Sequence, residues 1–188
     1  DISVLSFDIE TNSLKYNPDF SKVLIISNTF RRMGKIIRKN FCLDEYKGDE
    51  RKMLDDWCAG VREQNPSLMV GHNILAFDIP YLDSRAFNLG VKLNLGRDGS
   101  RITFDKWTTK KRKDATQNVE FFNSHIFGRE IVDTMFVCLN FDFKREFPSY
   151  GLKPVIKHLG LEKADRTFID PAKIGKYYEQ FTSTGHCP

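Results

Sequence analysis

The stretch "VLSFDIETNSL" (residues 4–14) places two acids, Asp8 and Glu10, one residue apart inside an apolar run. Successive side chains of a β-strand point to opposite faces, so both carboxylates lie on one face, about 7 Å apart. Phe7 and Ile9 then point to the other face, which we expect to be the core. Two carboxylates this close raise each other's pKa unless a cation lies between them. The stretch therefore predicts a cation site, an exposed strand face or a salt bridge at the strand end.

The order of elements around this stretch predicts a mixed α/β domain. "ISVLSFDIE", "KVLIISNTF" and "KIIRKNFCL" have the composition of strands, and the turn "RRMG" separates the last two. Residues 49–63 and 77–90 carry apolar side chains at helical spacing, on either side of a short strand in "NPSLMVGHN". We expect parallel pairing wherever a helix crosses over between two strands.

The second half of the chain predicts an inserted β-hairpin and two further helices. "RITFDKW" and "NVEFFNSHIF" form the arms of the hairpin near residues 100–128, and its tip, residues 110–113, is strongly basic. "YGLKPVIKHLG" and "IDPAKIGKYYEQ" predict helices, with Asp170 as the N-cap of the second. The basic tip is either a solvated loop or a contact to a nucleic-acid backbone.

Composition limits the class of protein without fixing its function. The chain of 188 residues, 40% of them hydrophobic, is long enough to form one domain over residues 1–188. Its net charge of +4 permits a polyanionic partner but does not require one. No segment approaches the ~18 consecutive apolar residues of a membrane helix. The four cysteines show no C-x-x-C pair, which argues against zinc and fits reduced thiols inside a cell.

A second motif, "GHNILAFDIPYL" (residues 71–82), places Asn73 five residues before Asp78. Asp78 lies at the start of an expected helix, where a carboxylate either caps the helix or reaches towards a metal ion. Phe77 and Tyr81 either pack in the core or stack on the terminal base of a single strand. Carboxylate oxygens are the ligands that hard divalent cations such as Mg²⁺ prefer.

Together, "FDIET" and "GHNILAFDIPYL" closely resemble the Exo I and Exo II motifs of the 3′→5′ exonuclease domain of family-B DNA polymerases. "NLGRDGS", "IFGREIVDTM" and "SYGLKPVIKHLG" resemble the segments that follow in archaeal and eukaryotic members, so that the resemblance covers nearly the whole chain. It implies an RNase H-like fold, a mixed sheet flanked by helices. It also implies a proofreading exonuclease that removes 3′-terminal nucleotides from single-stranded or mispaired DNA with two bound Mg²⁺ or Mn²⁺ ions.

The resemblance assigns roles to eight residues. It implies that three acids are catalytic and hold the metal ions, namely Asp8, Glu10 and Asp78. It implies that five further residues contact the single-stranded 3′ end, namely Ile9, Thr11, Asn73, Phe77 and Tyr81. Of the two ions, one would lower the pKa of a water molecule and the other would stabilise the leaving 3′ oxygen.

The sequence departs from the family pattern in two places. Ala76 stands where many members have a second Asn, and the Tyr-x-x-x-Asp pattern of the Exo III motif is absent. Asp133, Asp165 and Asp170 are conceivable substitutes for the fourth acid, although Asp133 belongs to a strand segment and is better explained as structural. We expect a fragment that lacks the C-terminal Exo III helix.

These features lead to one expected function and two alternatives. We expect a monomeric exonuclease, either joined to a polymerase domain in the same full-length chain or free-standing. It would act in the cytoplasm, nucleoid or nucleus, or in the host cell of a virus. One alternative is an inactive exonuclease-like module that binds nucleic acid or a partner, and the other is an exonuclease acting on RNA.

Overall fold

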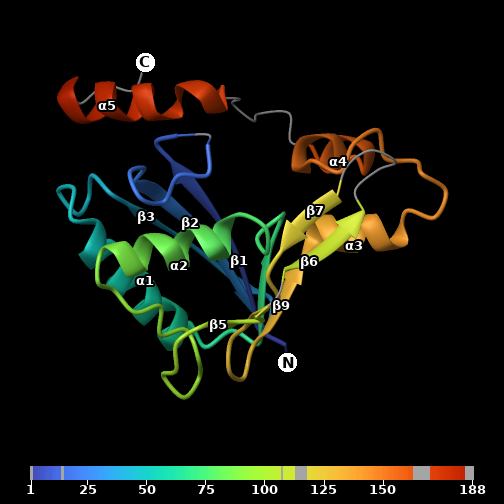
Figure 1. Ribbon diagram of the computed structural model, residues 1–188, viewed down its shortest axis with the longest axis horizontal. Helices are drawn as coiled ribbons and strands as arrows, with labels where there is room; N and C mark the ends of the chain where they lie inside the picture. The colour runs from blue at the N-terminus through green and yellow to red at the C-terminus, as the bar shows by residue number, and fades with distance from the viewer. Residues whose placement is uncertain (1, 14, 107, 113–117, 163–169, 185–188) are drawn as a thin grey trace.

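The computed structural model describes residues 2–13, 15–106, 108–112, 118–162 and 170–184 (Figure 1). The strands are β1 (Val4–Thr11), β2 (Val23–Arg32), β3 (Lys35–Cys42), β4 (Leu68–Gly71), β5 (Thr103–Phe104), β6 (Thr109–Arg112), β7 (Asn118–Phe121), β8 (Ser124–His125) and β9 (Glu130–Asp133). The helices are α1 (Glu50–Gln64), α2 (Asp78–Asn88), α3 (Thr134–Phe141), α4 (Leu152–His158) and α5 (Ile174–Thr184), with a 3₁₀ turn at Pro171–Lys173.

Five of the strands form one mixed sheet in the order β3-β2-β1-β4-β9. The pairs β3–β2 and β2–β1 are antiparallel, whereas β1–β4 and β4–β9 are parallel. Helix α1 makes the crossover between the antiparallel strands and β4, and α1 and α2 lie in front of the sheet in Figure 1. The predicted mixed α/β sheet flanked by helices is therefore confirmed, and β1 lies at its centre.

The two faces of β1 differ as the sequence alternation predicts. Leu5, Phe7 and Ile9 are buried, and the Phe7 ring lies 5.6 Å from that of Trp57 on α1, centroid to centroid. On the opposite face Asp8 is exposed and Glu10 is half-buried. The apolar face thus anchors the strand in the core, and the acidic side chains are left on the other side.

Local signals in the sequence explain where the first two helices begin and end. The Asp49 side chain accepts a hydrogen bond from the Lys52 amide and caps α1, which ends at Asn65 in the left-handed region (φ 48°). Gly90, just beyond α2, also has a positive φ, of 68°. Both conformations favour Asn or Gly, which makes the ends readable from sequence.

A buried ion pair joins α1 to α2. Arg85 donates to both carboxylate oxygens of Glu50, at 2.9 and 2.7 Å, and both side chains are buried. Glu50 also accepts a hydrogen bond from the Val23 amide at 2.8 Å. The pair therefore ties both helices to the start of β2.

The inserted hairpin near residues 100–128 is present as two short ladders, β5 with β8 and β6 with β7. Of its predicted basic tip, residue 113 lies outside the described residues, as do the side chains of residues 110–112. Helix α3, which directly follows β9, was not predicted. Within the described ranges, no helix has both the length and the apolar character needed to span a membrane.

Candidate metal and nucleic-acid site

Asp78 joins the two sequence motifs in space. It is the first residue of α2 and is 3% exposed, and its Oδ1 accepts a hydrogen bond from the Ile9 amide at 3.0 Å. Ile9 lies between Asp8 and Glu10 on β1, so this bond holds the start of α2 against the acidic strand. Asp78, which lies 69 residues beyond Ile9 in the sequence, is thereby brought next to the strand that carries Asp8 and Glu10.

These acids interact unfavourably with one another. Burial, and then the charge of Asp8, raise the pKa of Asp78 to about 7, although the Ile9 amide opposes the shift. Burial and Asp8 also raise the pKa of Glu10, and Lys153 on α4 lowers it. Asp8 thus acts on both neighbours, as expected of carboxylates that share a site.

The donor chemistry of this cluster fits a hard divalent cation, because carboxylate oxygens repel one another until a cation is bound. The ligand geometry is less complete. Within the described part of the chain, no three His, Cys, Asp or Glu side chains converge into a set that could hold a metal ion. The acids therefore supply suitable ligands, and a closed coordination shell would require a shift of side chains or a further ligand.

Asp133 orders the loop that carries Asn73. Its carboxylate accepts hydrogen bonds from the amides of Asn73 at 2.8 Å and Leu75 at 3.1 Å, and it caps α3 through the Met135 amide at 2.9 Å. Asn73 itself has φ 67°, a left-handed conformation that Asn tolerates. Because these amides engage both carboxylate oxygens, Asp133 is structural, as its place in the sequence suggested.

His72 closes the same loop from the other side. One ring nitrogen lies 2.9 Å from Thr134 Oγ1, and the other lies 2.8 Å from the Tyr150 carbonyl. The second conceivable substitute acid, Asp170, accepts from the Ala172 amide at 3.0 Å and caps the turn before α5. Asp165 lies outside the described residues.

The aromatic residues of the second motif form a cluster with a residue that the sequence reasoning missed. Tyr16 is 50% exposed and packs edge-on against Phe77 and Tyr81, which lie 5.5 Å from each other. Tyr81 has no exposed surface, and its hydroxyl donates to the Ser21 carbonyl at 2.8 Å. In this conformation Tyr81 supports the other two rings, and Tyr16 and Phe77 are the ones within reach of a ligand.

A family model of the exonuclease domain of DNA polymerase family B matches residues 1–155. The chain belongs to this family. A DNA polymerase of Pyrococcus glycovorans is 30% identical over 136 residues, which cover 70% of this chain and 17% of the relative. The DNA polymerase delta catalytic subunit of Drosophila melanogaster is 32% identical over 181 residues, which cover 86% of this chain and 16% of the relative.

A solved structure of the family B DNA polymerase from Pyrobaculum calidifontis has the same architecture as this exonuclease domain. The two superpose with a TM-score of 0.70 and 25% sequence identity, over 95% of this chain and 21% of that chain. The likeness confirms the predicted fold class, an RNase H-like mixed sheet flanked by helices. The exonuclease domain described here thus spans about a fifth of its structural relative, and less of the two polymerases above.

The remaining predicted contacts of this exonuclease domain lie beside the acids. Ile9 is buried, and its backbone amide donates to Asp78. Thr11 is half-buried and donates its hydroxyl to the Ser13 carbonyl at 2.7 Å. Ala76, at the position of the missing Asn, packs against the apolar cluster of Phe121, Met135, Phe136 and Tyr150. The substrate roles of Ile9, Thr11, Asn73, Phe77 and Tyr81 stay predictions.

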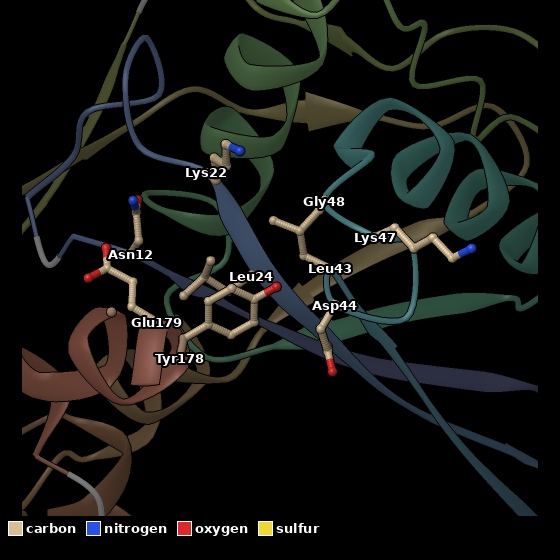
Figure 2. A pocket seen from close by; sticks show the side chains of 10 residues that line it. Asn12, Lys22, Leu24, Leu43, Asp44, Lys47, Gly48, Tyr178 and Glu179 are labelled. Atoms are coloured by element: carbon tan, nitrogen blue, oxygen red, sulfur yellow. The ribbon is translucent and has the colours of Figure 1, made fainter. Parts of the chain in front are cut away.

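Figure 2 shows a cavity of about 640 Å³ between the end of β1 and α5. Apolar side chains of Leu24 and Leu43 form part of its wall, with Tyr178 of α5 opposite them (Figure 2). Its charged lining residues are two lysines and two acids, namely Lys22, Asp44, Lys47 and Glu179. None of the predicted metal ligands lines it, so the cavity and the acidic cluster are separate features.

Proposed function

We propose that this exonuclease domain removes nucleotides one at a time from the 3′ end of single-stranded or mispaired DNA, by hydrolysis that depends on two divalent cations. The observation that carries the proposal is the hydrogen bond between Asp78 Oδ1 and the Ile9 amide. It brings the acid of the second motif to the acidic strand of the first, as a shared metal site requires.

In this proposal Asp8, Glu10 and Asp78 hold the cations, which are Mg²⁺ or Mn²⁺. Bound cations would lower the pKa of an attacking water and stabilise the leaving 3′ oxygen. The chain itself holds the strand: Phe77 and Tyr16 offer ring faces and edges to the terminal base. The carboxylates need no covalent role, because hydrolysis of the terminal phosphodiester releases a nucleoside 5′-monophosphate directly.

We assign Asn73 the role of orienting the 3′ end rather than of binding metal. Asp133 accepts a hydrogen bond from the backbone amide of Asn73. The Asn73 side chain takes no part in that bond. Ile9 and Thr11 lie on either side of Glu10 on β1, and we assign both of them contacts to the DNA strand. These contacts would fix the scissile bond over the acids, and positioning of this kind supplies much of the rate enhancement in enzymes.

We also propose that the domain proofreads for a polymerase domain in the same full-length chain, as a monomer inside the cell. Support comes from the relatives, which are DNA polymerases of which this chain covers only 16–17%. A free-standing exonuclease of the same family is the alternative arrangement. Sequencing the coding region downstream of residue 188 distinguishes the two.

The test of the activity is a 5′-labelled single strand incubated with the protein and Mn²⁺. We expect a stepwise ladder of products shortened from the 3′ end, and we expect Asp8→Ala to abolish it by removing a metal ligand. Asp55→Ala is the matched control, because Asp55 is an exposed acid on α1 and lies outside the proposed site. Its ladder should equal that of the unaltered protein.

Two outcomes would contradict the proposal. A ladder that survives Asp8→Ala would place hydrolysis elsewhere, and strand binding without any ladder would make the chain a binding module. Competition between matched DNA and RNA strands tests the substrate class. Preferential cleavage of RNA would mean that the substrate is RNA, while the proposed site would stay the same.

A further inference from the structure

The end of the β2–β3 hairpin is the most concentrated basic surface among the described side chains. Five cations lie within nine residues, namely Arg31, Arg32, Lys35, Arg38 and Lys39, and residues 29–43 contain no acid. Every residue from 31 to 40 is exposed. The hairpin forms one edge of the sheet, because β3 is its outermost strand.

Most of these cations lack a protein partner within the described residues. No acid there forms an ion pair with Arg31, Arg32, Lys35 or Arg38, whereas Arg85 and Arg101 are each paired. Lys39 lies over the Phe41 ring, with its Nζ 4.6 Å from the centroid. The cluster therefore repels itself and attracts a polyanion.

Strand register separates the cations into two sets. Arg32 pairs with Lys35, and Asn28 pairs with Lys39, on the face of the sheet that carries the buried Phe30. Arg31 and Arg38 point to the other face, since they alternate with those residues along β2 and β3. That other face is the one that carries Asp8.

The same register gives the path from Asp8 to the two arginines. Asp8 pairs with Ser27, and Ser27 with Asn40, in one row across three strands. The next row on this face is Ser6, Thr29 and Arg38, and the row after it contains Arg31. Rows on one face are about 7 Å apart and strands about 5 Å apart, so Arg38 lies roughly 12 Å from Asp8 between Cα atoms.

The surface between them is polar and accessible. Ser6 and Asn40 are exposed, and Ser27 and Thr29 are half-buried. Hydroxyl and amide side chains of this kind commonly accompany arginine in contacts to a phosphate backbone. An anionic strand could therefore follow this face from the arginines to the acids without crossing an apolar barrier.

We propose that Arg31 and Arg38 bind phosphate groups of the DNA strand whose 3′ end reaches Asp8. The inference rests on the proposed function for the direction of the strand and for its identity as DNA. Arginine suits this role because its planar guanidinium pairs with phosphate oxygens through two hydrogen bonds. Charges on an edge strand also discourage edge-to-edge pairing, a role that would need no ligand.

The test measures binding of a fluorescein-labelled oligothymidylate by anisotropy over a series of KCl concentrations, in EDTA to prevent cleavage. We expect Arg31→Gln/Arg38→Gln to weaken binding on the order of tenfold at low salt and to reduce the slope of log K against log salt by about 1.4. Arg31→Lys/Arg38→Lys should retain the slope, because it keeps both charges. Equal melting temperatures by circular dichroism establish that the variants are folded.

The matched control is Arg51→Gln/Lys92→Gln, which removes two exposed cations on α1 and just beyond α2. It should leave the slope unchanged. An unchanged slope in the Arg31/Arg38 variant, or an equal loss in the control, would overturn the proposal. Weaker binding to a poly-glutamate peptide with unaltered binding to DNA would also overturn it, by assigning the surface to an acidic protein.

This result is separable from that of the cleavage assay. Asp8→Ala should keep the salt slope of the unaltered protein in EDTA while it abolishes the ladder. Absence of cleavage with the slope difference intact would refute the proposed activity and leave the phosphate contacts standing. Cleavage without a difference in salt slope would refute the phosphate contacts of Arg31 and Arg38 and leave the proposed activity standing.

Discussion

Two buried carboxylates, Glu50 at the start of α1 and Asp78 at the start of α2, differ in the charges that surround them. Glu50 is 4% exposed and meets the Arg85 guanidinium through two hydrogen bonds. Asp78 is 3% exposed, and the charges that act on it include those of Asp8 and Asp133, which raise its pKa. Burial removes both carboxylates from water, which costs free energy in each case. Among the described residues, only Glu50 has a cationic side chain paired with it.

The difference separates a structural acid from one that we propose to be functional. A buried charge without a counter-ion is expensive, and chains avoid it where only stability matters. Asp78 retains that cost beside a second acid, at the position where the family motif places a metal ligand. The proposed site thus accepts an electrostatic penalty that a bound cation would relieve, whereas the Glu50–Arg85 pair is already satisfied.

Removing the counter-ion of Glu50 should have the largest effect on stability. We expect Arg85→Met to lower the free energy of unfolding by about 3–5 kcal/mol, because it leaves a buried carboxylate unpaired. Urea unfolding followed by circular dichroism measures the change. It would turn Glu50 into an acid as poorly compensated as Asp78.

The double variant Arg85→Met/Glu50→Gln supplies the control. Removing both charges together should recover much of the loss, since the penalty comes from the unpaired carboxylate. A single variant within 1 kcal/mol of the unaltered protein would show that the ion pair is not the element that stabilises this region.

The pH dependence of stability should come next in size. The pKa of Asp78 is raised from 3.8 to about 7 in the folded state, so the folded protein binds its proton more tightly than the unfolded chain. The stabilising contribution is complete below pH 4 and is lost as the pH rises through 7. A tenfold change in proton affinity is worth about 1.4 kcal/mol, so the loss is at most about 4 kcal/mol.

Asp78→Asn should remove this slope, because an amide mimics the protonated acid and does not titrate. Unfolding free energies measured in EDTA between pH 4.5 and 8 would give the difference between the two proteins. Asp55→Asn, at an exposed position, should keep the slope of the unaltered protein. Mg²⁺ or Mn²⁺ should stabilise the unaltered protein at pH 8 but not Asp78→Asn; parallel pH curves for the two would contradict the account of the site.

The parts of the site that were predictable from sequence are those fixed by local spacing. Alternation along β1 placed Asp8 and Glu10 on one face, and the helix start placed Asp78. The Glu50–Arg85 pair and the burial of Tyr81 depend on how α1, α2 and the loop after β1 meet, which no local pattern encodes. Tyr16 was missed for the same reason, although an aromatic residue soon after the acidic strand was a usable signal.

Helix α3 shows a signal that was present and unused. Asp133-Thr134 directly precedes an apolar run, and Asp133 caps the helix through its carboxylate. The prediction that Asp133 belongs to a strand segment was correct, but the strand ends at Asp133 and a helix begins at the next residue. Asp133 also accepts hydrogen bonds from the amides of Asn73 and Leu75, which lie about 60 positions away in the sequence. No local sequence pattern predicts these bonds.

Asp133 adds a third way to compensate a buried acid, by backbone amides alone, and it should show the smallest effect of the three. We expect Asp133→Asn to cost about 1–3 kcal/mol of unfolding free energy, because one amide loses its acceptor. Cleavage should also slow, since the loop that carries Asn73 is held by these bonds. Asp49→Ala is the control: Asp49 caps α1 through the Lys52 amide and does not contact the loop that carries Asn73. It should lose similar stability and keep its cleavage rate, and equal slowing in both variants would mean that Asp133 stabilises the fold without positioning the site.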